Sequence, residues 1–245
     1  MSSSPMRLSS GFTQDMSFQP LGLIGIPNPL FYATCVDDYI GYIPGRYVNT
    51  ITGTGSIAQT SGVGGRLLFT TNTTTPATTD IASQQLDAAA CQIQTTKKAA
   101  ALFRLQLADI LNPAILVGEI QTTTTPFTVT DGVYFSKASG STNLTFNVMA
   151  SSVLVASTTL PGLLTANTDI DLGFTYDGRG NILVFAGAGL VGQVLNQNTT
   201  PLGPAARLTP ASFPTALLNG TIAIQSGTAT SKTMNVDFRF SALER

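Results

Sequence analysis

Acidic residues are the first candidates for chemistry in this chain. The glutamates are Glu119 and Glu244, and Asp169 and Asp171 stand two positions apart. Glycosidases use two carboxylates about 5 to 10 Å apart across the scissile bond. Residues two apart on a strand share a face, so Asp169 and Asp171 are the best available pair. They come just before an alternating apolar run, where an aspartate pair more often caps a loop or faces solvent, so we predict no catalytic site.

The absence of histidine narrows the chemistry further. With no histidine in the chain, Ser-His-Asp and Cys-His catalysis and histidine-bearing zinc sites are excluded. The segment Gly187–Gly192 matches G-x-G-x-x-G, but that fingerprint needs a following helix and an acid about 20 residues later. No acid occurs between Asp177 and Asp237. The glycines therefore indicate a bulge or tight bend, and we expect no cofactor.

Two acidic segments are possible calcium sites by residue type. Asp37-Asp38 and the segment 177–180 lack the spaced acids that supply six to eight oxygen ligands, so we expect no metal. Asp177-Gly178 instead predicts a hairpin turn. The two cysteines, Cys35 and Cys91, are too few for a disulfide framework and are interpreted as buried reduced thiols.

The elements that must position any site are strands. The C-terminal residues Met234, Val236, Phe238 and Phe240 alternate with polar residues, which predicts a strand with these four side chains on its buried face. About a dozen such segments, separated by Gly, Pro, Asn and Asp turns, predict an antiparallel two-sheet sandwich. The same alternation recurs at Phe103, Leu105, Leu107, at Leu144, Phe146, Val148, at Ile170, Leu172, Phe174, Tyr176, and at Ile222, Ile224. One short helix is expected within Ala82–Ala90.

The composition favours a surface for protein contacts over an enzyme surface that attracts its substrate by charge. Charged residues are only 10% of the chain and the net charge is -1, so polarity comes from Thr, Ser, Asn and Gln. Without a basic surface, nucleic-acid binding is not expected. No apolar run is long enough to cross a bilayer and no apolar signal region begins the chain, which predicts no membrane insertion and synthesis in a cytoplasm.

Residues 1–35 differ from the rest. Four prolines and scattered apolar residues without a period predict an extended arm that packs on its own domain or on a neighbouring molecule, followed by one sandwich domain over residues 36–245. A disordered leader is the alternative. The predicted contact residues of the arm are Phe12, Phe18, Leu21, Ile24, Ile26, Leu30 and Phe31.

Several segments together resemble a known family. They are Asp37–Tyr39, Gly64–Phe69, Ala101–Leu107, Asp131–Phe135 and Leu172–Gly178. Their order is similar to the strand order of concanavalin-like jelly-roll domains over Val36–Arg245. The Thr-rich, low-charge style and the arm leading into Asp37–Tyr39 also resemble virion structural proteins of tailed bacteriophages.

The resemblance implies an all-β, concanavalin-like jelly roll with a non-enzymatic role in a virion. The expected function is that of a cement or decoration protein, which binds the major capsid protein on the outside of a phage capsid after synthesis in the host cytoplasm. Self-association as a trimer or dimer is expected, with Ile182–Leu195 as either a subunit contact or internal core. The alternatives are a tail or fibre adhesin that binds bacterial surface glycan, and a carbohydrate-binding or hydrolytic concanavalin-like domain.

Overall fold

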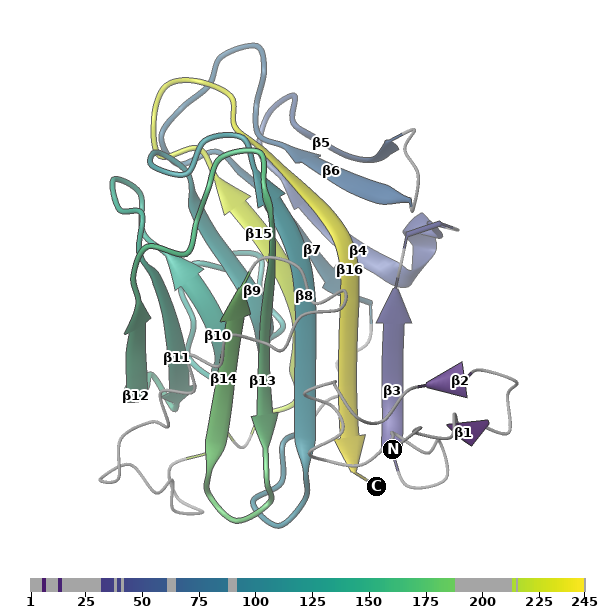
Figure 1. The fold of residues 1–245 in the computed structure, drawn as a ribbon. Helices are drawn as coiled ribbons and strands as arrows, with labels where there is room; N and C mark the ends of the chain where they lie inside the picture. Colours follow the sequence, from purple (N-terminus) through teal and green to yellow (C-terminus); the bar gives the residue numbers. More distant parts are fainter. Residues whose placement is uncertain are drawn as a thin grey trace.

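The computed structural model describes residues 6–7, 13–14, 32–37, 39–40, 42–60, 65–87, 92–187, 213–214 and 216–244. These residues form two antiparallel sheets packed face to face, as Figure 1 shows, with a single turn of 3-10 helix at Pro44–Arg46. The predicted all-β, two-sheet sandwich is therefore confirmed. The predicted boundary near residue 35 stays a prediction, although a strand, β3 (Tyr32–Asp37), runs across it.

We call the sheet that contains the C-terminal strand the front sheet. Its order is β14 (Ile182–Gly187), β13 (Asp169–Tyr176), β8 (Ala99–Leu107), β16 (Thr233–Glu244), β6 (Arg66–Thr70) and β5 (Ser56–Thr60). β16 pairs with β8 along most of its length, while its other edge pairs first with β6 and then with β3. The C-terminal strand therefore pairs with three strands from the first half of the chain and holds them in one sheet.

The back sheet has seven strands, as the front sheet does when β3 is counted. Its order is β12 (Val153–Leu160), β11 (Leu144–Ala150), β10 (Gly132–Lys137), β9 (Ala114–Gln121), β15 (Leu218–Gln225), β7 (Ile81–Leu86) and β4 (Tyr47–Ile51). Two very short strands, β1 (Met6–Arg7) and β2 (Thr13–Gln14), pair separately with each other.

The core between the sheets confirms most of the predicted alternation. Every apolar residue predicted on β8, β11, β13 and β15 is buried in this core, together with Met234 and Val236 of β16. Ile182 and Val184 of β14 also belong to it, so this part of Ile182–Leu195 is internal core; residues 188–195 lie outside the described part.

The prediction for the second half of β16 was wrong. Val236 pairs with Leu105 and Phe238 with Arg104, so Asp237 is an extra residue, a β-bulge. A bulge shifts the side-chain period by one. After it, Phe238 and Phe240 lie on the outer face, where Phe240 packs with Ala100 and Ala242. The alternate residues, Arg239 and Ser241, turn between the sheets.

The predicted helix within Ala82–Ala90 is also wrong, because Ile81–Leu86 is the strand β7. This segment pairs with β15 on one side and with β4 on the other, so sheet pairing overrides the helix propensity of its Ala, Gln and Leu residues. The turn predicted at Asp177-Gly178 is confirmed: Asp177 N donates to Asn181 O at 3.2 Å, and Gly178 has a φ of 73°.

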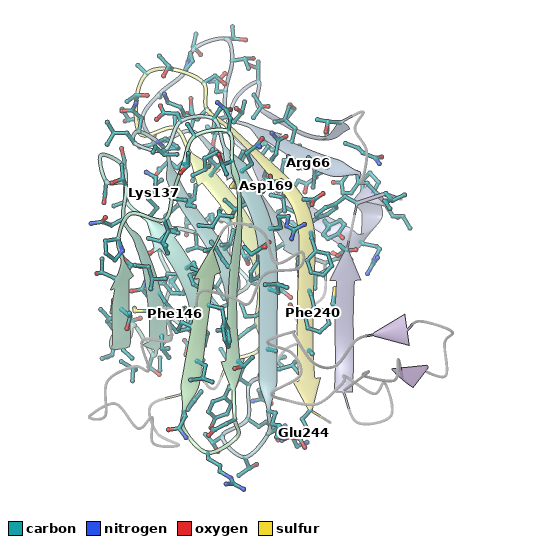
Figure 2. The ribbon with its side chains drawn as sticks, in the orientation of Figure 1. Arg66, Lys137, Phe146, Asp169, Phe240 and Glu244 are labelled. Carbon is teal, nitrogen blue, oxygen red and sulfur yellow. The ribbon has the colours of Figure 1, made fainter. Side chains whose placement is uncertain are left out.

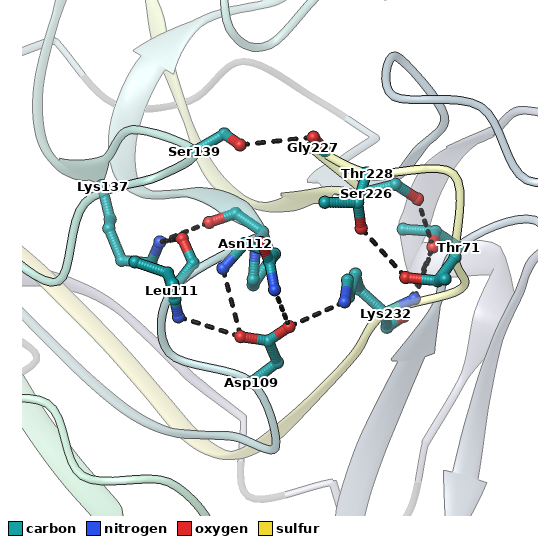
Figure 3. A network of polar contacts seen from close by, with 12 residues as sticks. Thr71, Asp109, Leu111, Asn112, Lys137, Ser139, Ser226, Gly227, Thr228 and Lys232 are labelled. Atoms are coloured by element: carbon teal, nitrogen blue, oxygen red, sulfur yellow. Dashed lines mark hydrogen bonds and ion pairs between the residues drawn. The ribbon is translucent and has the colours of Figure 1, made fainter.

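Polar contacts fasten the loops at one end of the sandwich (Figure 3). The Lys137 ammonium group is buried and donates to the carbonyl oxygens of Leu111, Pro113 and Ala138 at 2.9, 2.5 and 3.1 Å. Asp109 accepts hydrogen bonds from the backbone of Leu111 and Asn112, and an ion pair with Lys232 Nζ at 2.7 Å ties it to a loop far along the chain. These contacts give the end of the sandwich a defined shape without regular structure.

Candidate functional site

The outer face of the front sheet gathers charged residues from four neighbouring strands. We call this set the ion-pair face, and its members are Arg66, Arg104, Asp169, Asp171 and Asp237. The whole chain has 12 basic and 13 acidic residues, so five of 25 charges lie on one patch. In a chain with so few charges, this concentration makes the patch the first candidate site.

The strand register explains how these residues meet. Asp171 of β13 lies directly opposite Arg104 of β8, and both side chains point outward because their neighbours Leu172 and Phe103 point into the core. Asp169 lies opposite Gln106, which in turn lies opposite Asn235 of β16. The resulting polar rows run across the strands and define a continuous face.

Two different ion pairs hold the aspartates. Arg104 contacts Asp171 at two points, Nε to Oδ1 at 2.7 Å and Nη2 to Oδ2 at 3.1 Å. Arg66 Nη2 lies 2.7 Å from Asp169 Oδ2, so one ion pair reaches from β6 to β13 across β16 and β8, and Figure 2 shows both residues toward the same end of the sheet. Three strand spacings amount to about 14 Å, so both side chains must lean over the face.

The bulge residue links these two pairs. Asp237 Oδ1 lies 3.9 Å from Arg66 Nε, and Asp237 Oδ2 lies 3.6 Å from Arg104 Nη1. The bulge therefore adds a carboxylate at the centre of the face. Next to it along β16, the outward-facing Phe238 is half-buried and supplies an aromatic ring beside the charged groups.

The four carboxylates considered for catalysis lie at three different places in the structure. Asp169 and Asp171 share a face, but each is paired with an arginine. Glu119 is on β9 in the back sheet and points between the sheets, where it accepts a hydrogen bond from Ser241. Glu244 accepts one from the backbone N of Lys98 at 2.7 Å, at the end of β16.

Asp169 retains the capacity to bind a further group. Its side chain is 33% exposed, but its Oδ1 atom is buried without a hydrogen-bond partner within the described residues, so a ligand would meet the carboxylate at Oδ2, which already accepts from Arg66. A carboxylate can accept about four hydrogen bonds. The ion-pair face therefore offers acceptors, guanidinium donors and an aromatic ring within one surface.

Sequence reasoning missed a second polar cluster, which lies between the sheets. Arg239 is 0% exposed and Glu119 3% exposed, and Tyr39 and Ser241 are also buried here. Burial opposes the charge on Arg239, but the nearby Glu119 carboxylate outweighs this and the pKa of Arg239 lies above its ordinary value. The local sequence gives no signal for this cluster, because only the bulge at Asp237 turns Arg239 inward.

The Asp37 segment, considered above for calcium, is committed to protein contacts. Asp37 Oδ1 lies 3.2 Å from Arg46 Nη1, and Cys35 Sγ lies 3.8 Å from Asp37 Oδ2. Burial raises the pKa of the Cys35 thiol. Within the described ranges, no group of three His, Cys, Asp or Glu residues could hold a metal ion.

Several predicted residues lie outside the described part of the chain. They are Asp38, Cys91, the glycine segment after Gly187, and the arm residues Phe12, Phe18, Leu21, Ile24, Ile26, Leu30 and Phe31. Their predicted roles stay predictions. A search of the described residues found no helix long and apolar enough to cross a membrane.

Comparison with known proteins shows which solved structures share this fold. No protein-family model matches the sequence, and neither does any curated protein. Solved structures do match. One is lectin II from Ulex europaeus, which is 12% identical to this chain and superposes with a TM-score of 0.56 over 86% of this chain and 98% of the lectin. The endo-1,3-beta-glucanase from Streptomyces sioyaensis matches at 12% identity and 0.55, over 86% of this chain and 96% of the enzyme.

A third match is a protein of unknown function from Shewanella oneidensis MR-1. It is 12% identical, with a TM-score of 0.54 over 92% of this chain and 94% of that protein. The chain therefore has the concanavalin-like jelly-roll fold that legume lectins and some glycosidases share. A fold of this kind hosts both binding and hydrolysis, so function must be argued from the face itself.

Proposed function

We propose that this protein binds carbohydrate without hydrolysing it, and that the ion-pair face is the binding surface. The observation that carries the proposal is the set of paired charges across β6, β16, β8 and β13, in which the Asp169 side chain is 33% exposed beside Arg66. Lectins and a glucanase with the same fold support this choice of ligand class.

The chemistry of the face suits a sugar. Neighbouring hydroxyl groups both donate and accept hydrogen bonds, so they need carboxylate acceptors and guanidinium donors held at fixed positions. Here each arginine is held by an aspartate, which fixes both groups before the ligand arrives and lowers the entropic cost of binding. Phe238 adds an apolar surface against which a sugar ring can pack.

The same pairing argues against hydrolysis. A glycosidase needs one carboxylic acid that carries a proton at working pH and a second carboxylate across the bond. Asp169 and Asp171 are both engaged by guanidinium groups, and Glu119 lies in the interior on the opposite sheet. We therefore expect no turnover of any bound glycan.

A glycan array probed with the full chain, followed by calorimetric titration of the best ligand, tests this proposal. Asp169→Asn should weaken binding by tenfold or more, because the amide loses one acceptor and its hold on Arg66. Asp87→Asn is the matched control: it makes the same charge change at an exposed position after β7 in the back sheet. Failure to bind any glycan, or equal affinities for the two variants, would contradict the proposal.

A second proposal, a structural role on a phage capsid, rests on a different observation. Large aliphatic side chains remain exposed in and before β4, namely Ile40, Ile43, Val48 and Ile51. Exposed apolar patches mark protein contacts. In this proposal the partner is the major capsid protein, and the low net charge lets many copies lie side by side.

Co-sedimentation with empty capsid shells, titrated to saturation, tests this second role. Decoration predicts saturation at a multiple of about 60 copies, as icosahedral symmetry requires. Ile43→Lys should then reduce capsid binding and leave glycan binding unchanged, whereas Asp169→Asn should do the reverse. No binding to shells would remove this proposal and leave the glycan proposal intact.

A further inference from the structure

The charges of the ion-pair face do not cancel. The face holds three aspartates and two arginines, which leaves a net charge of -1 on the patch. The strands β14, β13, β8, β16, β6 and β5 carry two other charged residues: Arg239 is buried between the sheets, and Glu244 is acidic and lies at the end of β16. No further cation on these strands therefore compensates the excess negative charge of the face.

The excess charge belongs to Asp237. Arg66 donates a hydrogen bond to Asp169 at 2.7 Å. Arg104 donates to Asp171 at 2.7 and 3.1 Å. Asp237 lies 3.9 and 3.6 Å from these two guanidinium groups, too far for a hydrogen bond, and within the described ranges no group donates one to its carboxylate. Its side chain is 21% exposed, so a ligand can reach an acceptor that no arginine holds as its own.

The bulge places an aromatic ring beside this carboxylate. Asp237 is the extra residue of β16, and it points outward together with the next residue, Phe238. In a regular strand two consecutive side chains lie on opposite faces. The bulge therefore presents an anionic group and a half-buried aromatic ring side by side to the same ligand.

Arg104 shows the sign of the potential over the face. The pKa of Arg104 lies above its ordinary value, chiefly because Asp171 accepts its hydrogen bonds, and the charges of Asp237 and Asp169 raise it further against the effect of burial. Negative charge that stabilises a protonated guanidinium group also stabilises a further cation at the face, and it opposes an anion.

We propose that the glycans bound by the ion-pair face carry free, protonated amino groups, as glucosamine units do, and that Asp237 binds the ammonium group. This inference rests on the proposed function, because it names the class of sugar for the same face. The two arginines keep their own aspartates, so the ammonium group binds without breaking an ion pair.

The chemistry of an amino sugar matches this arrangement. An ammonium group has three N–H donors, and hydrogen bonds between charged partners are stronger than neutral ones. The sugar ring beside it can pack its C–H groups on Phe238. An acetylated amino group is neutral and gains no charge-assisted bond, and an acidic sugar meets the excess negative charge of the face.

Calorimetric titration of the full chain with two hexasaccharides tests the inference. One is the glucosamine hexamer and the other is the N-acetylglucosamine hexamer, which differs only in its acetyl groups. At mildly acidic pH and low salt, the free-amine hexamer should bind at least about tenfold more tightly, because it alone makes the charge-assisted contact. High salt should reduce the difference, since exposed charges are screened.

Two variants of the bulge residue assign the preference to its charge. Asp237→Asn removes the charge and should abolish the preference for the free amine. Asp237→Glu keeps the charge and should keep the preference. Both variants change the same residue, so a general effect on folding would affect both alike. Asp87→Asn, at an exposed position after β7, should behave like the wild type.

The outcomes separate this inference from the proposed function. Tight binding confined to uncharged or acidic glycans, equal affinities for the two hexamers, or a preference that Asp237→Asn keeps or Asp237→Glu loses would each overturn the inference and leave glycan binding in place. If the wild type binds no glycan on an array that includes free-amine sugars, the proposed function is wrong and the inference fails with it.

Discussion

Arg239 of β16 lies directly against Gly220 of β15, and its guanidinium group occupies the space that a Cβ atom at position 220 would fill. The two residues come from opposite sheets. Gly220 is therefore required for space and not for an unusual backbone conformation. Its register partner on the next strand is Glu119, the carboxylate whose charge acts on Arg239. One glycine thus makes room for a buried cation beside a buried anion.

Gly220→Ala should destabilise the protein by about 2–3 kcal/mol, because an added methyl group in a closely packed interior forces its neighbours to move. Chemical denaturation of variant and wild type would measure the loss. Gly45→Ala is the control, since a Cβ there would meet no atom within 4 Å. Equal stabilities of the Gly220 and Gly45 variants would show that Arg239 does not occupy this space.

Arg239→Met should cost about 3–5 kcal/mol because it leaves the Glu119 carboxylate buried without its positive neighbour. The three guanidinium nitrogens have no hydrogen-bond partner within the described residues, so the lost contribution is mainly electrostatic. Adding Glu119→Gln to Arg239→Met should therefore restore much of the stability. A double-mutant cycle from denaturation curves measures this coupling; additive losses would refute it.

The same residue shows what the sequence could and could not predict about the fold. Strict alternation predicted the strands and the buried faces of β8, β11, β13 and β15, because a half-buried strand must repeat every two residues. It also assigned Phe238 and Phe240 to the face between the sheets, and this was wrong, although Phe240 is buried in a separate cluster on the outer face. Both side chains are apolar, as a buried face requires, but the extra residue at Asp237 reverses the two faces of the strand after it. The position of the bulge is set by the pairing of β16 with β8, and the alternation within β16 alone does not contain this information.

The candidate site was predictable only in part. The i, i+2 spacing of Asp169 and Asp171 correctly placed both on one strand face. Arg66 and Asp169 are 103 positions apart, and they meet because β16 and β8 lie between their strands in the sheet. Such a pair depends on strand order, and nothing in the local sequence around Arg66 indicates its partner.

Asp109→Asn should make the free energy of unfolding less sensitive to a fall in pH. Burial opposes ionisation of Asp109, but hydrogen bonds from Lys232, Asn112 and Leu111 outweigh it and hold the pKa of this carboxyl well below its usual range. A carboxyl with a lowered folded-state pKa stabilises the protein above the unfolded value of about 4, and this contribution is lost as pH falls below it.

The measurement is the free energy of unfolding in urea between pH 7 and pH 2. The wild type should lose stability more steeply below about pH 4 than Asp109→Asn, and at pH 7 the variant should be less stable by about 1–3 kcal/mol from its weakened hydrogen bonds. Asp87→Asn, at an exposed position, should follow the wild-type curve. Parallel curves for the wild type and Asp109→Asn would contradict the assigned role of Asp109.

The two main pairs of the ion-pair face should differ in their effect on stability, because they differ in burial. Asp171 is 3% exposed and Arg104 contacts it at two points, so Arg104→Met should cost about 3 kcal/mol or more by leaving a buried carboxylate without its guanidinium partner. Arg66 and Asp169 are both about a third exposed, and an exposed pair contributes about 1 kcal/mol or less. Arg66→Met is therefore the matched control, with the same change on the same face.

Adding Asp171→Asn to Arg104→Met separates charge from packing. If the uncompensated carboxylate causes the loss, the neutral amide should recover most of it, and thermal unfolding of the three variants would show this order. A double variant as unstable as Arg104→Met alone would mean that the arginine acts through the packing of its aliphatic part. Since the glycan proposal depends on rigidly held side chains, a small loss from Arg104→Met would also weaken the argument that the face is fixed before a ligand binds.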